Sequence, residues 1–389
     1  MARPSPFDVQ ELLDHCIDSL AVGAKRRDFT ADLLSCALVA RSWTNPAQSH
    51  LFRDPHFTNS RIEYEMSGQT MFKFSRTVNG SPHLVQHVRV IWAPMNRGGE
   101  TDYTRATRKM WQLEYTNLER LRLDVLIPEM YKEAIERLLR SPRLQYLRLL
   151  LHSCTLSDFQ DAFERTARTL EHLDIRFACP VGSVRTPSPD FAPIPLKSLR
   201  VGMWKGFDED YKKLGRLLDL SQLKALAIYY GPTSPPWGLM STTTIEVLQI
   251  WAEENHYVEG LDLSLFPKLN TLRLDLLNRL PSSLLLVLST IAPSQRIETI
   301  VIGVNGSIFE NTYFKDAPRL DEALASLPLL PLPTIEVEID RDTGIEVSPE
   351  VLFPSLVEKD MLRVLWRKAL WRRDPDLNEG WWQDRIRNF

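Results

Sequence analysis

The residues best suited to chemistry in this chain are arginines and aromatic residues that recur at corresponding places in successive segments. An arginine guanidinium binds a carboxylate or a phosphate through two parallel hydrogen bonds. Arginine, tyrosine and tryptophan are also the commonest anchors of protein interfaces. Side by side, such residues would bind an acidic or phosphorylated protein target. The candidate target-binding residues are Arg122, Arg148, Arg176, Arg200, Tyr229 and Trp251.

A plainer interpretation of the same arginines remains open. Asp124 and Asp174 come from the same two places of the pattern as the arginines and could pair with arginines on neighbouring segments. An exposed pair of this kind contributes less than about 1 kcal/mol. In that case the row of arginines would be an ordinary solvated surface.

The sequence contains little that would support catalysis or cofactor binding. The chain has no glycine-rich phosphate loop and no Cys-x-x-Cys pair. His152 lies near Cys154, but the further ligands that a zinc site needs are missing from the surrounding sequence. No histidine falls in a nucleophile motif. The sequence therefore predicts a binding protein and not an enzyme, with no metal and no cofactor.

Composition narrows the partners and the compartment. The formal net charge is −3, so overall charge favours neither nucleic acid nor a membrane surface as a partner. The segment 1–18 lacks the apolar stretch of a secretory signal, and four cysteines are too few for a disulfide scaffold. We expect a cytoplasmic or nuclear protein with reduced cysteines: Cys16 and Cys36 buried, Cys154 and Cys179 near adjacent turns.

An internal repeat organises most of the chain. Its pattern is apolar-x-x-apolar-x-apolar-x-apolar, and each copy predicts one short strand of a parallel sheet. Side chains alternate between faces along a strand, so the fourth, sixth and eighth places point into a core. The fifth and seventh places, which hold the candidate arginines, lie on the opposite face. Clear copies start at Leu118, Leu144, Leu170, Leu196, Leu223, Ile245, Leu269 and Ile297, and weaker copies start at Val85 and Leu332.

Between the predicted strands the apolar spacing changes to the helical period. Helix faces are predicted within 130–139, 159–167, 284–291 and 320–327. The returns at 181–195 and 231–241 are rich in Pro, Ser and Gly, and we expect extended or turn-like chain there.

This pattern resembles the leucine-rich-repeat family, whose repeats span roughly 20–29 residues. The resemblance implies an α/β solenoid over 84–345, with a parallel β-sheet and outer helices and loops. Partners of such solenoids usually bind the concave face of the sheet, which is where the candidate arginines and aromatics would lie. Most copies lack the Asn or Cys with which the family bonds the next loop, so we expect the loop register to be looser than in a consensus array.

The first 60 residues follow a different pattern, with apolar residues at helical spacing over 9–20 and 33–40. Two blocks carry a further likeness: Pro6, Asp8, Gln10, Glu11 and Leu12 in the first, and Leu34, Cys36, Leu38, Val39, Arg41, Ser42 and Trp43 in the second. They resemble the F-box, especially the F-box-like domains that precede irregular leucine-rich repeats in mushroom-forming fungi. This predicts a small all-α F-box-like module at 1–60, joined to the solenoid by a linker at 61–83.

The F-box resemblance implies binding to a Skp-family adaptor and, through it, to a cullin. An apolar face too small to fold over itself would be buried on the adaptor. Alternatively, several of the same side chains could close the core of the module. The candidate adaptor-binding residues are Pro6, Phe7, Val9, Leu12, Leu38 and Val39.

The favoured function is therefore the substrate-recognition subunit of a Skp–cullin–F-box ubiquitin ligase, with the target bound by the repeats. The second hypothesis is a leucine-rich-repeat scaffold with no connection to a ligase. A nucleic-acid binder that uses the arginine row and stacking aromatics is a third hypothesis, and the net negative charge disfavours it.

The segment 346–389 is rich in tryptophan. Leu362, Leu365, Trp366, Ala369 and Leu370 fall on one helical face. A terminal repeat exposes its core, so a solenoid needs a cap at its end. We predict such a cap here, in preference to a helix that lies on a membrane surface.

Overall fold

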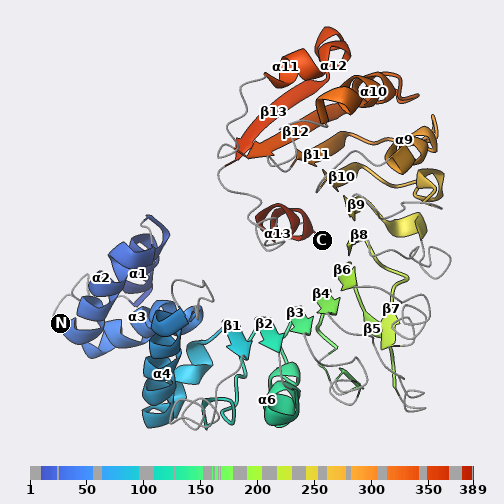
Figure 1. Ribbon diagram of the computed structural model, residues 1–389. Helices are drawn as coiled ribbons and strands as arrows, with labels where there is room; N and C mark the ends of the chain where they lie inside the picture. Colours follow the sequence, from blue (N-terminus) through green and yellow to red (C-terminus); the bar gives the residue numbers. More distant parts are fainter. Residues whose placement is uncertain are drawn as a thin grey trace. The chain divides into compact units, whose positions relative to one another are not determined.

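The computed structural model describes residues 10–23, 26–55, 64–95, 109–125, 128–151, 160, 163–164, 166, 168–177, 191–203, 217–229, 242–252, 261–276, 282–304, 313–340, 348–367, 379–387 and 389. The chain forms two compact bodies, which are described separately (Figure 1). The N-terminal body comprises Met1–Cys154 and Asp158–Leu170, and the C-terminal body comprises Thr155–Ser157 and Glu171–Phe389. The protein is α/β, and its eleven sheet strands, three in the first body and eight in the second, run parallel within each body.

Three helices open the N-terminal body: α1 (Gln10–Gly23), α2 (Arg26–Val39) and α3 (Arg41–Arg53). They pack on one another around a small core, in which Ile17, Leu33 and Ala47 are fully buried. A break separates α2 from α3 because Ala40 takes an extended conformation, with φ −156° and ψ 156°. A helical module thus stands where one was expected, while its F-box character stays a prediction.

The two cysteines of this module differ. Cys36 on α2 is buried, as expected. Cys16 is exposed, and the expectation that it would be buried is wrong because Ile17, next to it on α1, faces the core instead. Cys154 and Cys179 lie outside the described residues.

A helix occupies the segment where a linker was expected. α4 (Tyr64–Gly80) is followed by the 3-10 turn η2 (Pro82–His87). Met71, Ser75 and Val78 are buried, and their spacing puts them on one face of α4. The expected linker at 61–83 is corrected to a helix because this stripe gives the segment a face to bury.

Three strands complete the N-terminal body: β1 (Val90–Met95), β2 (Arg120–Val125) and β3 (Tyr146–Leu151), which pair in that order. α6 (Pro128–Leu139) connects β2 to β3. This confirms the helix that the apolar spacing within 130–139 predicted.

The first weak repeat copy is three residues out of register in the sequence-based assignment. That assignment put Arg89 in the same row as Arg122. In the structure Trp92 pairs with Arg122, so the first repeat begins at Val88 and not at Val85. The reason is local: η2 takes up the residues before the strand, and Val88 is fully buried at its end.

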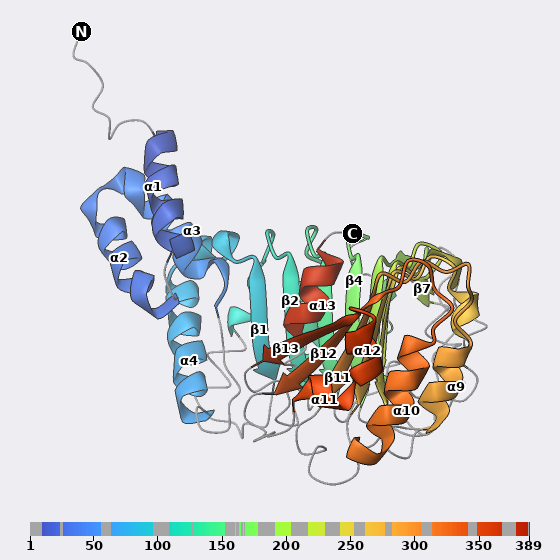
Figure 2. The same cartoon turned by 90° about the horizontal axis from the view of Figure 1, so that it is seen from above.

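The C-terminal body contains one large parallel sheet and one small sheet, seen from above in Figure 2. The small sheet pairs β5 (Ile194–Pro195) with β7 (Leu218–Asp219). The large sheet contains, in spatial order, β4 (His172–Phe177), β6 (Ser198–Met203), β8 (Ala225–Tyr229), β9 (Val247–Ala252), β10 (Thr271–Leu276), β11 (Thr299–Val304), β12 (Thr334–Asp340) and β13 (Leu362–Arg367).

Short helices and turns connect these strands on the outer side of the sheet (Figure 1). Helices α9 and α10 confirm the helix faces predicted within 284–291 and 320–327, whereas most of 159–167 and of the two Pro-rich returns lies outside the described residues. The connecting elements are η4 (Thr242–Thr244), η5 (Leu263–Leu265), α9 (Ser282–Ser289), α10 (Tyr313–Ala325), α11 (Pro349–Leu352) and α12 (Pro354–Glu358).

Within the C-terminal segment, a strand occupies residues for which the apolar spacing predicted a helix. β13 pairs with β12 through Leu362 beside Ile335 and Val364 beside Val337. The helix prediction over 362–370 is wrong at 362–367, because the edge of β12 offers a row of unpaired backbone groups that a strand can satisfy. The last helix, α13 (Glu379–Ile386), belongs to the C-terminal body.

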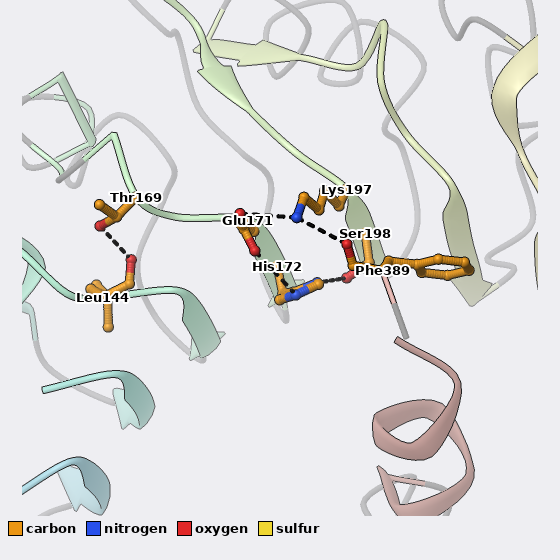
Figure 3. Close-up of polar contacts among 7 residues, drawn as sticks. All are labelled: Leu144, Thr169, Glu171, His172, Lys197, Ser198 and Phe389. Carbon is orange, nitrogen blue, oxygen red and sulfur yellow. Dashed lines mark hydrogen bonds and ion pairs between the residues drawn. The ribbon is translucent and has the colours of Figure 1, made fainter. Parts of the chain in front are cut away.

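Hydroxyl groups tie successive repeats together where an Asn or Cys is missing. Each donates a hydrogen bond to a main-chain carbonyl near the start of the preceding repeat. The bonds are Ser141 Oγ to Leu118 at 3.0 Å, Thr169 Oγ1 to Leu144 at 2.9 Å (Figure 3) and Thr244 Oγ1 to Leu223 at 2.7 Å. The paired strands within each body keep an unbroken register, and the looser register of the loops stays a prediction.

Candidate functional site

The helical module of the N-terminal body leaves large apolar side chains in solvent. On α1, Leu12 and Leu20 are 51% and 41% exposed. Leu12, Cys16 and Leu20 follow one another at intervals of four residues, so they lie on one face of the helix. On α2, Leu34 and Leu38 stand one turn apart and are 52% and 87% exposed. We call these two rows, together with Val39, the apolar stripes.

The helix arrangement explains why the apolar stripes stay uncovered. α1 and α2 both pack on α3, which uses one face of each helix for the core. His50 on α3 also contacts Asp18 on α1, with 2.6 Å between Nε2 and Oδ1. The opposite faces then have no further element of the described module to pack on.

Of the candidate adaptor-binding residues, Leu12, Leu38 and Val39 lie on the exposed apolar stripes. The alternative that these three close the core of the module does not fit their exposure. Pro6, Phe7 and Val9 lie outside the described residues.

The concave face of the C-terminal body, meaning the sheet face opposite the connecting helices, contains buried charges. Asp174 on β4 lies 3.4 Å from the Nη1 of Arg200 and 3.4 Å from the Nε of Arg176. Both Asp174 and Arg200 are fully buried. The Arg200 guanidinium also stacks over the Trp251 ring, at 4.6 Å from its centroid.

A second charge cluster lies further along the same face. Arg273 on β10 forms ion pairs with Asp275 at 2.9 Å and with Glu338 on β12 at 2.8 Å. Gln249 donates a hydrogen bond of 2.7 Å to Asp275. All four side chains are fully buried. Burial by itself lowers the pKa of Arg273, but the carboxylates of Asp275 and Glu338 outweigh it and raise that pKa above its ordinary value.

Helix α13 and the residues after it lie on this concave face (Figure 1). The Trp381 ring stacks against the Arg273 guanidinium, with 4.9 Å between that group and the ring centroid. Lys197 donates a hydrogen bond of 2.9 Å to the main-chain oxygen of Phe389, as Figure 3 shows. Lys224 lies 5.3 Å from the centroid of the Phe389 ring. Trp382 is almost completely buried.

The candidate target-binding residues of this body are therefore not an open surface. Arg176, Arg200 and Trp251 are buried, and the side chain of Tyr229 is not among those described. The expected exposure is wrong because α13 covers the face and because Asp174 pairs with both arginines.

The described parts of the C-terminal segment lie at two places in this body. One part, β13, extends the sheet by one strand. The other, α13, brings Trp381 against Arg273 on β10, on the concave face. Capping of the sheet end by this segment stays a prediction.

The N-terminal body has a more accessible group of arginines and aromatics. Arg122 is half-buried and stacks over the Trp92 ring at 3.7 Å, and Arg120 lies 5.1 Å from the Tyr146 ring centroid. Arg148, in register with Arg122, is buried.

Sequence reasoning missed several residues of these surfaces. Trp92 was hidden by the register error at the first repeat. The repeat pattern puts Arg273 in the row of the candidate arginines and Glu338 in the neighbouring row, but neither was chosen as a candidate. Lys197 and Lys224 lie just before their strands, outside those rows, and gave no signal.

A scan against protein-family models finds no match, and a search of curated proteins finds none either. Within the described residues, no cluster of three or more His, Cys, Asp or Glu side chains could hold a metal ion. Within the same part of the chain, no helix is both long and apolar enough to cross a membrane.

Proposed function

We propose that this protein is the substrate-recognition subunit of a Skp–cullin–F-box ubiquitin ligase, with its parallel repeats belonging to the leucine-rich-repeat class. The observation that carries this proposal is the pair of apolar stripes on α1 and α2. Exposed leucines of this number on so small a helical module favour burial on a partner. The F-box resemblance identifies that partner as a Skp-family adaptor.

The energetics of docking are sufficient for a specific contact. Burying one exposed leucine side chain contributes about 1.5–3 kcal/mol, and Leu38 is 87% exposed. Leu34, one turn earlier on the same helix, would be buried in the same contact. A few such anchors determine the affinity of most interfaces.

In this proposal the protein performs no chemistry. The repeats hold a protein target while the module holds the adaptor, which raises the effective concentration of the target near the ubiquitin-conjugating enzyme.

The test is direct binding between the purified chain and a Skp-family adaptor, measured by calorimetry. Leu38→Asp should weaken binding by at least about thirtyfold, because a charge replaces a buried anchor. Leu286→Asp is the matched control, since Leu286 is a leucine of similar exposure (68%) on α9 in the other body. It should leave adaptor binding unchanged.

Two outcomes oppose the proposal. If the wild-type chain and the adaptor do not associate at about 50 µM, the ligase connection is lost and the scaffold hypothesis takes its place. If both substitutions weaken binding equally, the apolar stripes are not the docking surface.

A further inference from the structure

We infer that residues 379–389 are a detachable internal ligand of the concave face of the C-terminal body. The same face would then bind, in trans, a target segment with the same chemistry: a short helix with a tryptophan in its first turn and an aromatic residue after its end. This deepens the proposed function, on which the identity of the face as a target site rests.

The contacts of residues 379–389 resemble those of a ligand. The Trp381 ring stacks on the guanidinium of Arg273, and the Phe389 ring stacks near the ammonium of Lys224. Lys197 binds the Phe389 main-chain oxygen at 2.9 Å. A helix that lays aromatic anchors on a preformed surface is a common mode of peptide recognition.

The charges beneath α13 are compensated within the sheet. Arg176 and Arg200 face Asp174, and Arg273 faces Asp275 and Glu338, all from the strands themselves. These ion pairs would therefore remain in place if α13 left the face. The face can persist without its covering helix, which an ordinary apolar core could not do without a large cost.

One contact indicates that α13 is not a perfect fit. Trp381 is only 6% exposed, yet its indole Nε1–H finds no acceptor among the described residues. A buried donor without a partner weakens the state that contains it. A target whose tryptophan also finds an acceptor would have an advantage over α13.

The attachment of α13 to the same chain makes displacement a matter of concentration. Residues 368–378 join β13 to α13, and a short tether gives a local concentration on the order of millimolar. A free segment of equal intrinsic affinity would hardly bind while α13 is in place. A stronger or multivalent target would replace it.

The test uses the full chain and a fluorescent peptide with the sequence of residues 379–389. In the variant W381A/W382A the internal copy loses its anchors, so this variant should bind the peptide at least about tenfold more tightly than the wild-type chain does. The matched control is Asp384→Ala, because Asp384 is on α13 but its side chain is 72% exposed. It should behave as the wild type.

The site assignment is tested by two further arms. Lys224→Ala, added to W381A/W382A, should weaken peptide binding by roughly fivefold through loss of one cation–π contact. A peptide with both tryptophans changed to alanine should not bind. Equal binding of the peptide to the wild type and to W381A/W382A would overturn the inference, as would absence of binding to a W381A/W382A chain that melts cooperatively.

Hydrogen exchange on the wild-type chain gives an answer even if W381A/W382A does not fold. The amides of 383–386 should exchange at least about tenfold faster than the slowest amides of β9 and β10, because α13 opens by itself. Equal protection would show that α13 is part of the folded core and would overturn the inference. No adaptor is present in either experiment, so failure here and failure of adaptor docking are distinguishable.

Discussion

The two candidate surfaces each depart from the usual placement of side chains, one by exposing apolar residues and the other by burying charged ones. The helical module exposes Leu34 and Leu38, while the concave face of the C-terminal body buries Arg200 and Arg273. An exposed leucine costs the folded chain little, since that surface is also exposed on unfolding. A buried arginine requires a full set of partners, because an uncompensated charge away from water is strongly destabilising. Substitutions should therefore affect stability at the second surface and association at the first.

The largest expected effect is on the buried charges. Arg273→Met leaves Asp275 and Glu338 buried without their cation, and should lower the free energy of unfolding of the C-terminal body by about 3–5 kcal/mol. Urea unfolding followed by tryptophan fluorescence would measure it. The control is Arg363→Met, because Arg363 pairs with Glu336 at 3.1 Å but is 63% exposed; its loss should cost about 1 kcal/mol or less. Similar losses for both variants would show that burial of the charges does not matter.

The next effect separates the two sides of α2. Leu33→Ala should destabilise the module by about 2–5 kcal/mol, because Leu33 is fully buried and its truncation leaves a cavity. Leu38→Ala, on the exposed side, should change stability by less than about 0.5 kcal/mol. Helical circular dichroism during thermal unfolding would report both. A large loss with Leu38→Ala would contradict the assignment of the apolar stripes to solvent.

A smaller effect is expected at the hydrogen bond between His50 and Asp18 in the module. His50 and Asp18 are 2.6 Å apart, but the Asp18 side chain is 62% exposed. Asp18→Asn should therefore cost no more than about 1 kcal/mol, well below the loss expected for Arg273→Met. Thermal unfolding of the two variants in the same buffer makes the comparison, and an equal cost would remove the distinction between exposed and buried pairs.

The smallest effect is a pH dependence at the junction between module and strands. Burial, and then His83 and Arg89, lower the pKa of His87 below its ordinary value of 6.5. The unfolded chain then binds a proton at a higher pH than the native state does, so native stability decreases as pH falls below about 6.5. Between pH 8 and pH 5.5, the unfolding midpoint of the wild type should therefore fall relative to that of His87→Gln. Parallel curves would exclude this contribution from His87.

The parallel sheet could be predicted from sequence because its signal is periodic. The apolar residues at the fourth and sixth places are most stable inside the core in every copy of the repeat. Trp92 shows the limit: with a single weak copy, the pattern fits two registers, and the η2 turn decides between them. Residues 362–367 do have helical apolar spacing, but they form a strand because backbone pairing with the open edge of β12 is more favourable.

The candidate site was less predictable, because it depends on contacts between distant segments. The pattern placed Arg176 and Arg200 correctly on the concave face, yet it contained nothing about what covers that face. Trp381 comes close to Arg273 only through the fold, and no spacing rule connects the two. On α2, Leu38 was a candidate for partner binding with burial in the local core as the alternative, and its exposure of 87% does not fit that alternative.

The position of α13 has a mechanical consequence. In a stack of repeats each repeat contacts only its neighbours, so the sheet can bend along its length and unfold from its ends. The segment 379–389 touches residues at β6, β8 and β10 together, through Lys197, Lys224 and Arg273. By joining these three strands, the segment restrains the curvature of the sheet in this body. If a target segment replaced residues 379–389, its own contacts would determine the curvature of the sheet.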